Sequence, residues 1–268
     1  MSRAGRTVAL AAGMLALVFS VLSACATSGA GAGSSGSNGD ETDSERTLTV
    51  LAAASLTESF TALGHRFEQQ HPDVQVRFSF DSSATLAEQA VQGAPADVLA
   101  TADRRTMQRA VTGGAVSGHP SVFATNTPVV VVPGDNPAGI AAVSDLDHPS
   151  TSYVVCVATA PCGAIADQVL ADQDIDTPPR SREVDVKAVL TKVQLGEADA
   201  GLVYATDAHA AGDRVTAVPV PHAERYLTSY PAAVLATSAH PALARQWLDL
   251  LASPAGRGVL TDAGFSTP

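Results

Sequence analysis

Short apolar runs alternate with amphipathic segments along the first half of the chain, and this alternation limits the fold more than any other feature. Residues 48–51, 74–80 and 98–101 have the composition of strands, and each is followed by apolar residues at helical spacing. The helices are expected over residues 55–71, 84–92 and 104–112. Strands that alternate with helices usually pair in parallel and are covered by those helices. The sequence therefore predicts an α/β protein with parallel strands.

The alternation continues in the second half of the chain. Thr127-Pro128-Val-Val-Val-Val-Pro133 is a continuous apolar run, which is typical of a strand buried on both faces. We expect the chain to leave a first lobe near this run and to return to it in the segment 230–236. The other expected strands are residues 153–158, 182–184, 202–204 and 215–220, and the other expected helices are 161–172, 186–195, 241–252 and 254–263, with short helices from Asp145 and Thr206.

The stretch LTVLAAASLTESF, residues 48–60, leads from a strand directly into a helix start. Three alanines, Ala52–Ala54, leave the corner open, and Ser55 begins the helix. The free N–H groups and the positive dipole of a helix start can hold a small anion without any cationic side chain. The alternative is that Ser55 is only the N-cap and that Glu58 closes a capping box. Taken alone, the stretch leaves both interpretations open.

The N-terminal residues 1–25 have the features of a bacterial secretion signal. Two arginines precede an apolar run over Val8–Leu22, which is short for a membrane span. The run ends in Leu22-Ser-Ala-Cys25, which resembles the lipobox of bacterial lipoproteins. That resemblance implies a lipid on Cys25 and localisation outside the cytoplasm, anchored to the cell membrane. An uncleaved membrane anchor is the alternative.

Composition and charge separate a tether from a folded part. Residues 26–46 are rich in Gly, Ser and acidic side chains and are predicted to be a flexible tether. The whole chain has a formal net charge of −11, so neither nucleic acid nor an anionic membrane surface is an expected partner. An anionic ligand would have to be held by local donors.

The remaining cysteines and the histidines limit the chemistry further. Cys156 and Cys162 are six residues apart in a chain that is predicted to be exported, where disulfides persist, so we expect a bridge. Two separate thiols are the alternative. The seven histidines lack the spacing of metal ligands, and no metal or cofactor is expected.

Six segments, taken together, resemble one family. They are AAASLTESF (52–60), SSATLAEQ (82–89), GAPADVLATAD (93–103), PCGAIA (161–166), EVDVKAVL (183–190) and GEADAGLVYATDA (196–208). In this order and at these spacings they resemble the molybdate-binding proteins of bacterial ABC transporters. The resemblance extends from about residue 47 to the C-terminus.

The resemblance implies a type II periplasmic-binding-protein fold, with two α/β lobes joined by two crossover segments. Lobe I would comprise residues 47–127 and 229–268, and lobe II residues 128–228. The implied function is capture of molybdate or tungstate between the lobes and delivery to an ABC permease. The implied protein is a monomer and not an enzyme.

The family's ligand set is carried over to five residues of this chain. Ser55 and Ser83 would each give a hydroxyl and a backbone N–H, Cys162 and Val186 a backbone N–H, and Tyr204 its phenol. A dehydrated dianion needs a donor for every oxygen, and four helix starts could supply them. Donors at fixed distances would reject the smaller sulfate by size, and they would reject phosphate by its proton.

Two residues depart from the family's pattern. Asp81 stands where a small neutral residue is common, and we expect it to point away from the anion as a cap. Cys162 stands where alanine is frequent, and a bridge to Cys156 would fix that corner, so reduction is expected to weaken binding.

Other functions remain as alternatives. The chain could bind another tetrahedral oxoanion such as sulfate. An exported hydrolase using Ser55 or Ser83 would need a positioned His and an acid, and the glycines of a nucleophile elbow are missing. A thiol oxidoreductase would usually have a closer cysteine pair. A lipid-anchored scaffold would bind no small molecule.

Overall fold

A computed structural model describes residues 46–268 of the chain. The predicted signal peptide, Cys25 and the predicted tether up to residue 45 lie outside the described residues. Arg46, which was predicted to be the last tether residue, is the first residue of strand β1. Among the described residues, none of the helices has both the length and the apolar character that a membrane span requires.

The first sheet has five strands in the order β2-β1-β3-β10-β4. Their bounds are β1 Arg46–Ala53, β2 Val74–Asp81, β3 Val98–Ala100, β4 Val116–Asn126 and β10 Thr228–Leu235. Strands β1, β2 and β3 pair in parallel, whereas β10 is antiparallel to both β3 and β4. The sheet is therefore mixed, and the prediction of parallel strands holds only for its first three.

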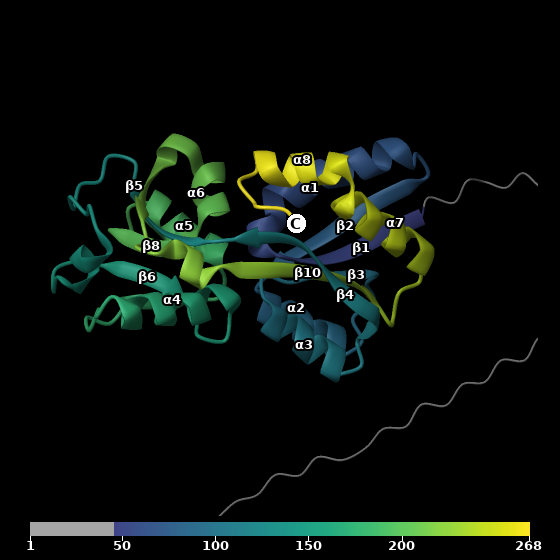
Figure 1. Ribbon diagram of the computed structural model, residues 1–268, viewed down its shortest axis with the longest axis horizontal. Coiled ribbons are helices and arrows are strands. Elements are labelled where there is room, and N and C mark those ends of the chain that lie inside the picture. Colours follow the sequence, from purple (N-terminus) through teal and green to yellow (C-terminus); the bar gives the residue numbers. More distant parts are fainter. Residues whose placement is uncertain (1–45) are drawn as a thin grey trace, which may run out of the picture. The chain divides into compact units, whose positions relative to one another are not determined.

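Helices cover both faces of this first sheet (Figure 1). Their bounds are η1 Ala54–Leu56, α1 Thr57–Gln70, α2 Ser83–Val91, α3 Arg104–Thr112, α7 Pro241–Ala252 and α8 Pro254–Asp262. Helices α1, α7 and α8 lie on one face, and α2 and α3 lie on the other. Phe60 and Phe67 of α1 contact the buried Trp247 of α7 edge to face, at ring-centroid distances of 5.4 and 5.6 Å. These apolar contacts fix α1, and hence its N-terminal corner, on the sheet.

The second sheet also has five strands, in the order β7-β6-β8-β5-β9. Their bounds are β5 Pro128–Pro133, β6 Tyr153–Cys156, β7 Ser181–Glu183, β8 Ala200–Tyr204 and β9 Val215–Pro219. The accompanying helices are η2 Val143–Asp147, α4 Pro161–Asp172, α5 Val186–Gln194, α6 Ala205–Ala211, η3 Gly212–Arg214 and η4 Ala223–Tyr226. Strands β6, β7 and β8 are parallel, and β5 is antiparallel to β8 and β9.

The chain passes between the two sheets twice. It leaves the first sheet between β4 and β5 and returns to it between β9 and β10. Two α/β lobes joined by two crossover segments are therefore confirmed. The residue boundaries given to the lobes stay a prediction. The chain re-enters the first sheet at the end where the parallel strands β1, β2 and β3 finish. Strand β10 therefore runs antiparallel to β3.

Strand β4 was not predicted from the sequence. Its eleven residues contain Gly118 and Pro120, which usually mark turns, and its exposed and buried residues do not alternate regularly. The structure accommodates Pro120 because β4 is an edge strand, where the missing N–H breaks no inner hydrogen bond. The register of β4 against β10 also shifts twice.

Candidate ligand-binding site

A small cavity of about 20 Å³ lies between the two lobes. This volume is smaller than that of the pockets that bind drug-sized ligands, which hold ~300–1,000 Å³. Its lining comprises Ala53, Ala54, Ser55, Asp81, Ser82, Ser83 and Ala102 of the first lobe, and Pro161, Cys162, Asp185, Val186 and Tyr204 of the second. The structure thus brings all five residues of the predicted ligand set around one cavity.

The first lobe contributes two strand-to-helix corners to the cavity. Ser55 lies in η1, directly after β1, and Ser83 is the first residue of α2, separated from the end of β2 by one residue. The Ser83 hydroxyl accepts a hydrogen bond from the backbone N–H of Ala102 at 2.9 Å. Its own proton is therefore free to be donated toward the cavity. Both serines are buried, at 4% and 2% exposure.

The capping-box interpretation of Ser55 and Glu58 is wrong. The Ser55 Oγ lies 2.9 Å from the hydroxyl of Tyr230, and it caps no backbone N–H. Glu58 binds the ammonium group of Lys187 with both carboxylate oxygens at 2.8 Å. A single turn of 3-10 helix precedes α1, so Ser55 stands inside the helical segment rather than at its cap.

The second lobe contributes the other two corners. Cys162 is the second residue of α4, and Val186 is the first residue of α5. Asp185 is the N-cap of α5 and accepts from the backbone N–H of Ala188 at 2.9 Å. The first N–H groups of a helix have no partner within the helix, so those of Cys162 and Val186 are available to a ligand.

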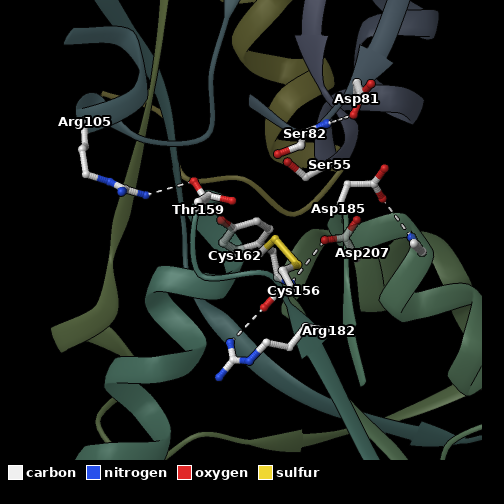
Figure 2. The surroundings of a disulfide bond; sticks show 12 residues. Ser55, Asp81, Ser82, Arg105, Cys156, Thr159, Cys162, Arg182, Asp185 and Asp207 are labelled. Carbon is white, nitrogen blue, oxygen red and sulfur yellow. Dashed lines mark hydrogen bonds between the residues drawn. A yellow bond between two sulfur atoms is a disulfide. The ribbon is translucent and has the colours of Figure 1, made fainter. Parts of the chain in front are cut away.

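A disulfide joins Cys156, the last residue of β6, to Cys162, with their Cα atoms 5.7 Å apart. Figure 2 shows this bond below Ser55 and Ser82, at the edge of the cavity. A Cβ atom on Gly163 would lie only 2.0 Å from the backbone oxygen of Val157. The glycine thus permits the start of α4 to pack against the loop after β6.

Tyr204 is the last residue of β8 and is 2% exposed. Its hydroxyl is buried and has no hydrogen-bond partner among the described residues. Burial raises the pKa of this phenol well above its ordinary value, so the group stays protonated and can donate. An unpartnered buried hydroxyl that lines a cavity is costly unless a ligand pairs with it.

Two carboxylates, Asp81 and Asp185, also line the cavity. Asp81 was expected to be a cap. Its Oδ1 does accept the adjacent N–H of Ser82 at 2.5 Å, but the N-cap residue of α2 is Ser82. The carboxylate of Asp185 accepts the backbone N–H of Ala188 in the first turn of α5. The lining contains no lysine or arginine, so its donors are neutral hydroxyl and N–H groups.

Sequence reasoning missed the ion-pair cluster beside the cavity. Lys187 follows the lining residue Val186, and its ammonium group lies 3.0 Å from Asp207 as well as 2.8 Å from Glu58. Burial opposes the charge of Lys187, but the two carboxylates together raise its pKa. Burial raises the pKa of Asp207, whose side chain is fully enclosed. A lysine in the first turn of α5 gives no sequence signal for a contact with α1.

Tyr230 was also missed as a contributor to the site. It is fully buried in β10, and from the sequence alone it was only one residue of an apolar strand. Only the return of β10 beside β3 places its hydroxyl against Ser55.

The arrangement as a whole suits a small anion. Helix starts from both lobes, two serine hydroxyls and one phenol line the cavity, so a compact group there can accept hydrogen bonds from both lobes. Within residues 46–268, no cluster of three or more His, Cys, Asp or Glu side chains could hold a metal ion. The neutral donors that line the cavity are suited to an anion.

Comparison with known proteins gives a family. The model of the bacterial extracellular solute-binding proteins matches residues 48–266. The molybdate-binding protein of Mycobacterium tuberculosis is 42% identical over 227 residues, which are 85% of this chain and 87% of that protein.

Solved structures share the fold. The periplasmic molybdate-binding protein of Azotobacter vinelandii aligns with a TM-score of 0.69 and 20% identity, covering 82% of this chain and 99% of that one. The sulfate-binding protein of M. tuberculosis aligns with a TM-score of 0.72 and 20% identity, covering 83% and 87% of the two chains. At such identities the likeness concerns the fold alone, and it confirms the predicted periplasmic-binding-protein architecture.

Proposed function

The chain belongs to the bacterial extracellular solute-binding proteins, and we propose that it captures molybdate between its two lobes. The observation that carries the proposal is the donor set of the cavity. Four helix starts, two from each lobe, and the unpartnered hydroxyl of Tyr204 face one small space. The 42% identical relative in M. tuberculosis, which is named a molybdate-binding protein, supports this ligand.

The donor set explains how a doubly charged anion could be held by an acidic protein. The net charge of −11 repels anions at long range, so the binding free energy must come from short contacts. Each oxygen of the dianion loses water on entry and needs a replacement donor. Ser55, Ser83 and Tyr204 supply hydroxyl protons, while Cys162 and Val186 supply backbone N–H groups. Because these donors come from both lobes, the ligand holds the lobes together.

The same donors would select among oxoanions by size. Donors on helix starts and strands are held at fixed separations, so a smaller tetrahedral ion such as sulfate reaches fewer of them at good length. Tungstate resembles molybdate in shape and is accepted on this argument. Sulfate is the second candidate, and the structural likeness to a sulfate-binding protein supports it.

The family places the chain outside the cytoplasm. We propose further that a lipid on Cys25 anchors the protein to the cell membrane and that an ABC permease receives the ligand from the closed lobes. Molybdate would be the cargo, and binding without chemical turnover requires neither a cofactor nor a catalytic group. A hydrolase at Ser55 has no support, since the hydroxyl pairs with Tyr230 rather than with a histidine.

The experiment that tests the function is a calorimetric titration of residues 40–268 with molybdate, with sulfate and phosphate as controls. Tight binding of one molybdate per chain, without comparable binding of the controls, is the expected result. Equal binding of sulfate would mean that the protein serves the uptake of another oxoanion, while the fold assignment would stand. Binding of none of the three ions would overturn the proposal.

A further inference from the structure

The hydroxyl of Ser55 forms the inner end of a chain of polar side chains. Its Oγ lies 2.9 Å from the Tyr230 hydroxyl, which in turn lies 3.4 Å from Nδ2 of Asn126. All three residues are buried. Where β10 begins and β4 ends, next to the crossover into the second lobe, Tyr230 pairs with Ala124 and Asn126 pairs with Thr228.

The orientation of Asn126 sets the direction of the chain. Its Oδ1 accepts the backbone N–H of Thr127 at 3.0 Å, so its amide NH₂ group must face Tyr230 and Thr206. An amide NH₂ group can only donate. The oxygen of Tyr230 therefore accepts from Asn126, and the phenol proton is directed to its other neighbour, Ser55.

Burial favours the protonated form of this phenol. Tyr230 has no solvent exposure, and burial raises its pKa far above the ordinary value. The rings of Phe123, Tyr204 and Phe265 pack edge to face around it at centroid distances of 6.3, 6.1 and 5.2 Å. These contacts hold the ring in one position, so its hydroxyl cannot turn away from Ser55.

We propose that Tyr230, oriented by Asn126, is a positioning residue that makes the Ser55 hydroxyl a fixed donor to the bound oxoanion. The inference rests on the proposed function. An isolated serine hydroxyl rotates and can present either its proton or its lone pairs. With Tyr230 donating to its oxygen, the Ser55 proton has the cavity as its remaining direction. Donation from Tyr230 also polarises the Ser55 O–H bond and strengthens its bond to an anion.

Ser83 gives an independent parallel. Its hydroxyl accepts the N–H of Ala102 at 2.9 Å, which leaves its proton for the cavity in the same way. The protein thus uses a backbone donor behind one serine and a tyrosine behind the other. The two carboxylates in the lining, Asp81 and Asp185, each accept a backbone N–H of their own helix start, from Ser82 and from Ala188.

The test is a double-mutant cycle of Ser55→Ala and Tyr230→Phe, with molybdate affinity as the readout. Tyr230→Phe alone is expected to weaken binding about tenfold, which corresponds to one hydrogen bond to a charged group. In the Ser55→Ala background the same change should alter affinity by less than about twofold, because Tyr230 acts only through Ser55. A merely structural role of Tyr230 would give the same loss in both backgrounds and would overturn the inference.

A matched control is Tyr226→Phe. Tyr226 is a buried tyrosine of the second lobe whose hydroxyl contacts Asp172 at 2.9 Å, outside the cavity lining. This variant should bind molybdate as the wild type does, and an equal tenfold loss would count against the specific role of Tyr230. Should thermal unfolding show that Tyr230→Phe is not folded, Asn126→Ala takes its place in the same cycle, with coupling to Ser55→Ala expected.

The two proposals fail in different ways. A wild-type protein that binds no oxoanion would overturn the proposed function and this inference with it. A wild-type protein that binds molybdate, with additive losses in the cycle, would overturn the inference alone.

Discussion

At the scale of single residues, the site depends on which hydroxyl groups already have partners inside the protein. Ser55 and Ser83 each contact one protein group, whereas the hydroxyl of Tyr204 contacts none among the described residues. A buried hydroxyl without a protein partner forms its hydrogen bond only with the ligand. Its removal therefore lowers ligand affinity but costs the ligand-free protein little stability. Tyr204 therefore separates binding from stability better than either serine does.

Tyr204→Phe is expected to lower molybdate affinity by about 10- to 100-fold, the value of a hydrogen bond to a charged group. The ligand-free protein should keep its free energy of unfolding, because no protein hydrogen bond is lost. Titration calorimetry and urea unfolding measure the two quantities. As a control, Tyr153→Phe removes a hydroxyl that donates to Thr177 and should cost stability but not affinity. Unchanged affinity of Tyr204→Phe would remove the phenol from the ligand set.

At the scale of elements, helix starts are held in place by contacts behind them. The disulfide between Cys156 and Cys162 fixes the start of α4 against the end of β6, and Arg182 donates to the backbone oxygen of Cys156 from the adjacent strand. The start of α5 is held by its N-cap Asp185 and by Lys187, which reaches α1 and α6. These contacts keep the donor N–H groups at fixed positions before any ligand enters.

Loss of the disulfide is expected to weaken both stability and binding. The Cys156→Ala/Cys162→Ala double variant should lose roughly 2 kcal/mol of unfolding free energy, as estimated for a short closed loop. Molybdate affinity should fall because the N–H of Cys162 is no longer held in place. Calorimetry with and without reductant measures this in the wild type, and the double variant, which has no bond to reduce, is the control. If reductant leaves the molybdate affinity of the wild type unchanged, the disulfide does not support binding.

Loss of Lys187 is expected to cost more stability than loss of its half-exposed partner Glu58. Lys187→Met leaves Asp207, whose side chain is fully enclosed, without its counter-charge, and should cost about 3 kcal/mol of stability. Glu58→Gln removes only the half-exposed partner on α1 and should cost less than about 1 kcal/mol. Urea unfolding of both variants measures the difference. Equal losses would show that burial of Asp207 does not decide the energetics of this cluster.

At the scale of the whole molecule, both the net charge of the chain and the carboxylates at the site are negative, so both repel an anionic ligand. The chain is acidic, with a net charge of −11, and carboxylates also line the cavity, yet the site has the donor set of an anion binder. Each lining carboxylate accepts a backbone N–H, of Ser82 or of Ala188, and the contacts to an anion come from the neutral donors of the lining. Similar carboxylate contacts elsewhere make the stability of the molecule depend on pH.

Acid is expected to destabilise the protein below about pH 4. Backbone N–H groups of Ala141 and Ala142 lower the pKa of Asp145 below its ordinary value of 3.8, and the N–H of Thr177 does the same for Asp147. A lowered pKa contributes stability that is present above the ordinary value and is lost as the pH falls through the folded-state value. The thermal midpoint should therefore be level from pH 7 to pH 5 and should fall toward pH 3.

Asp145→Asn provides the control for this pH dependence. The variant should unfold at a lower temperature than the wild type at pH 7, and the difference should shrink as the pH approaches 3. A constant difference over that range would show that the carboxylate of Asp145 contributes nothing through its ionisation.

The sequence by itself determined the local elements and where they end. Apolar runs of strand composition, each followed by apolar residues at helical spacing, indicated helix starts near residues 55, 84, 161 and 186. The five proposed ligand residues came from resemblance, and the structure brings them to one cavity. An edge strand such as β4, with its glycine and proline, carries no such local signal.

Only the tertiary structure decided which distant residues contact the strand-to-helix corners of the site. The contact of Tyr230 with Ser55 joins residues 175 positions apart, and that of Lys187 with Glu58 joins residues 129 positions apart. Such pairs depend on the order of strands in the sheets and on the approach of the two lobes, for which the local sequence has no preference. The corners are therefore set by short-range chemistry, whereas the direction of their hydrogen bonds is set by long-range packing.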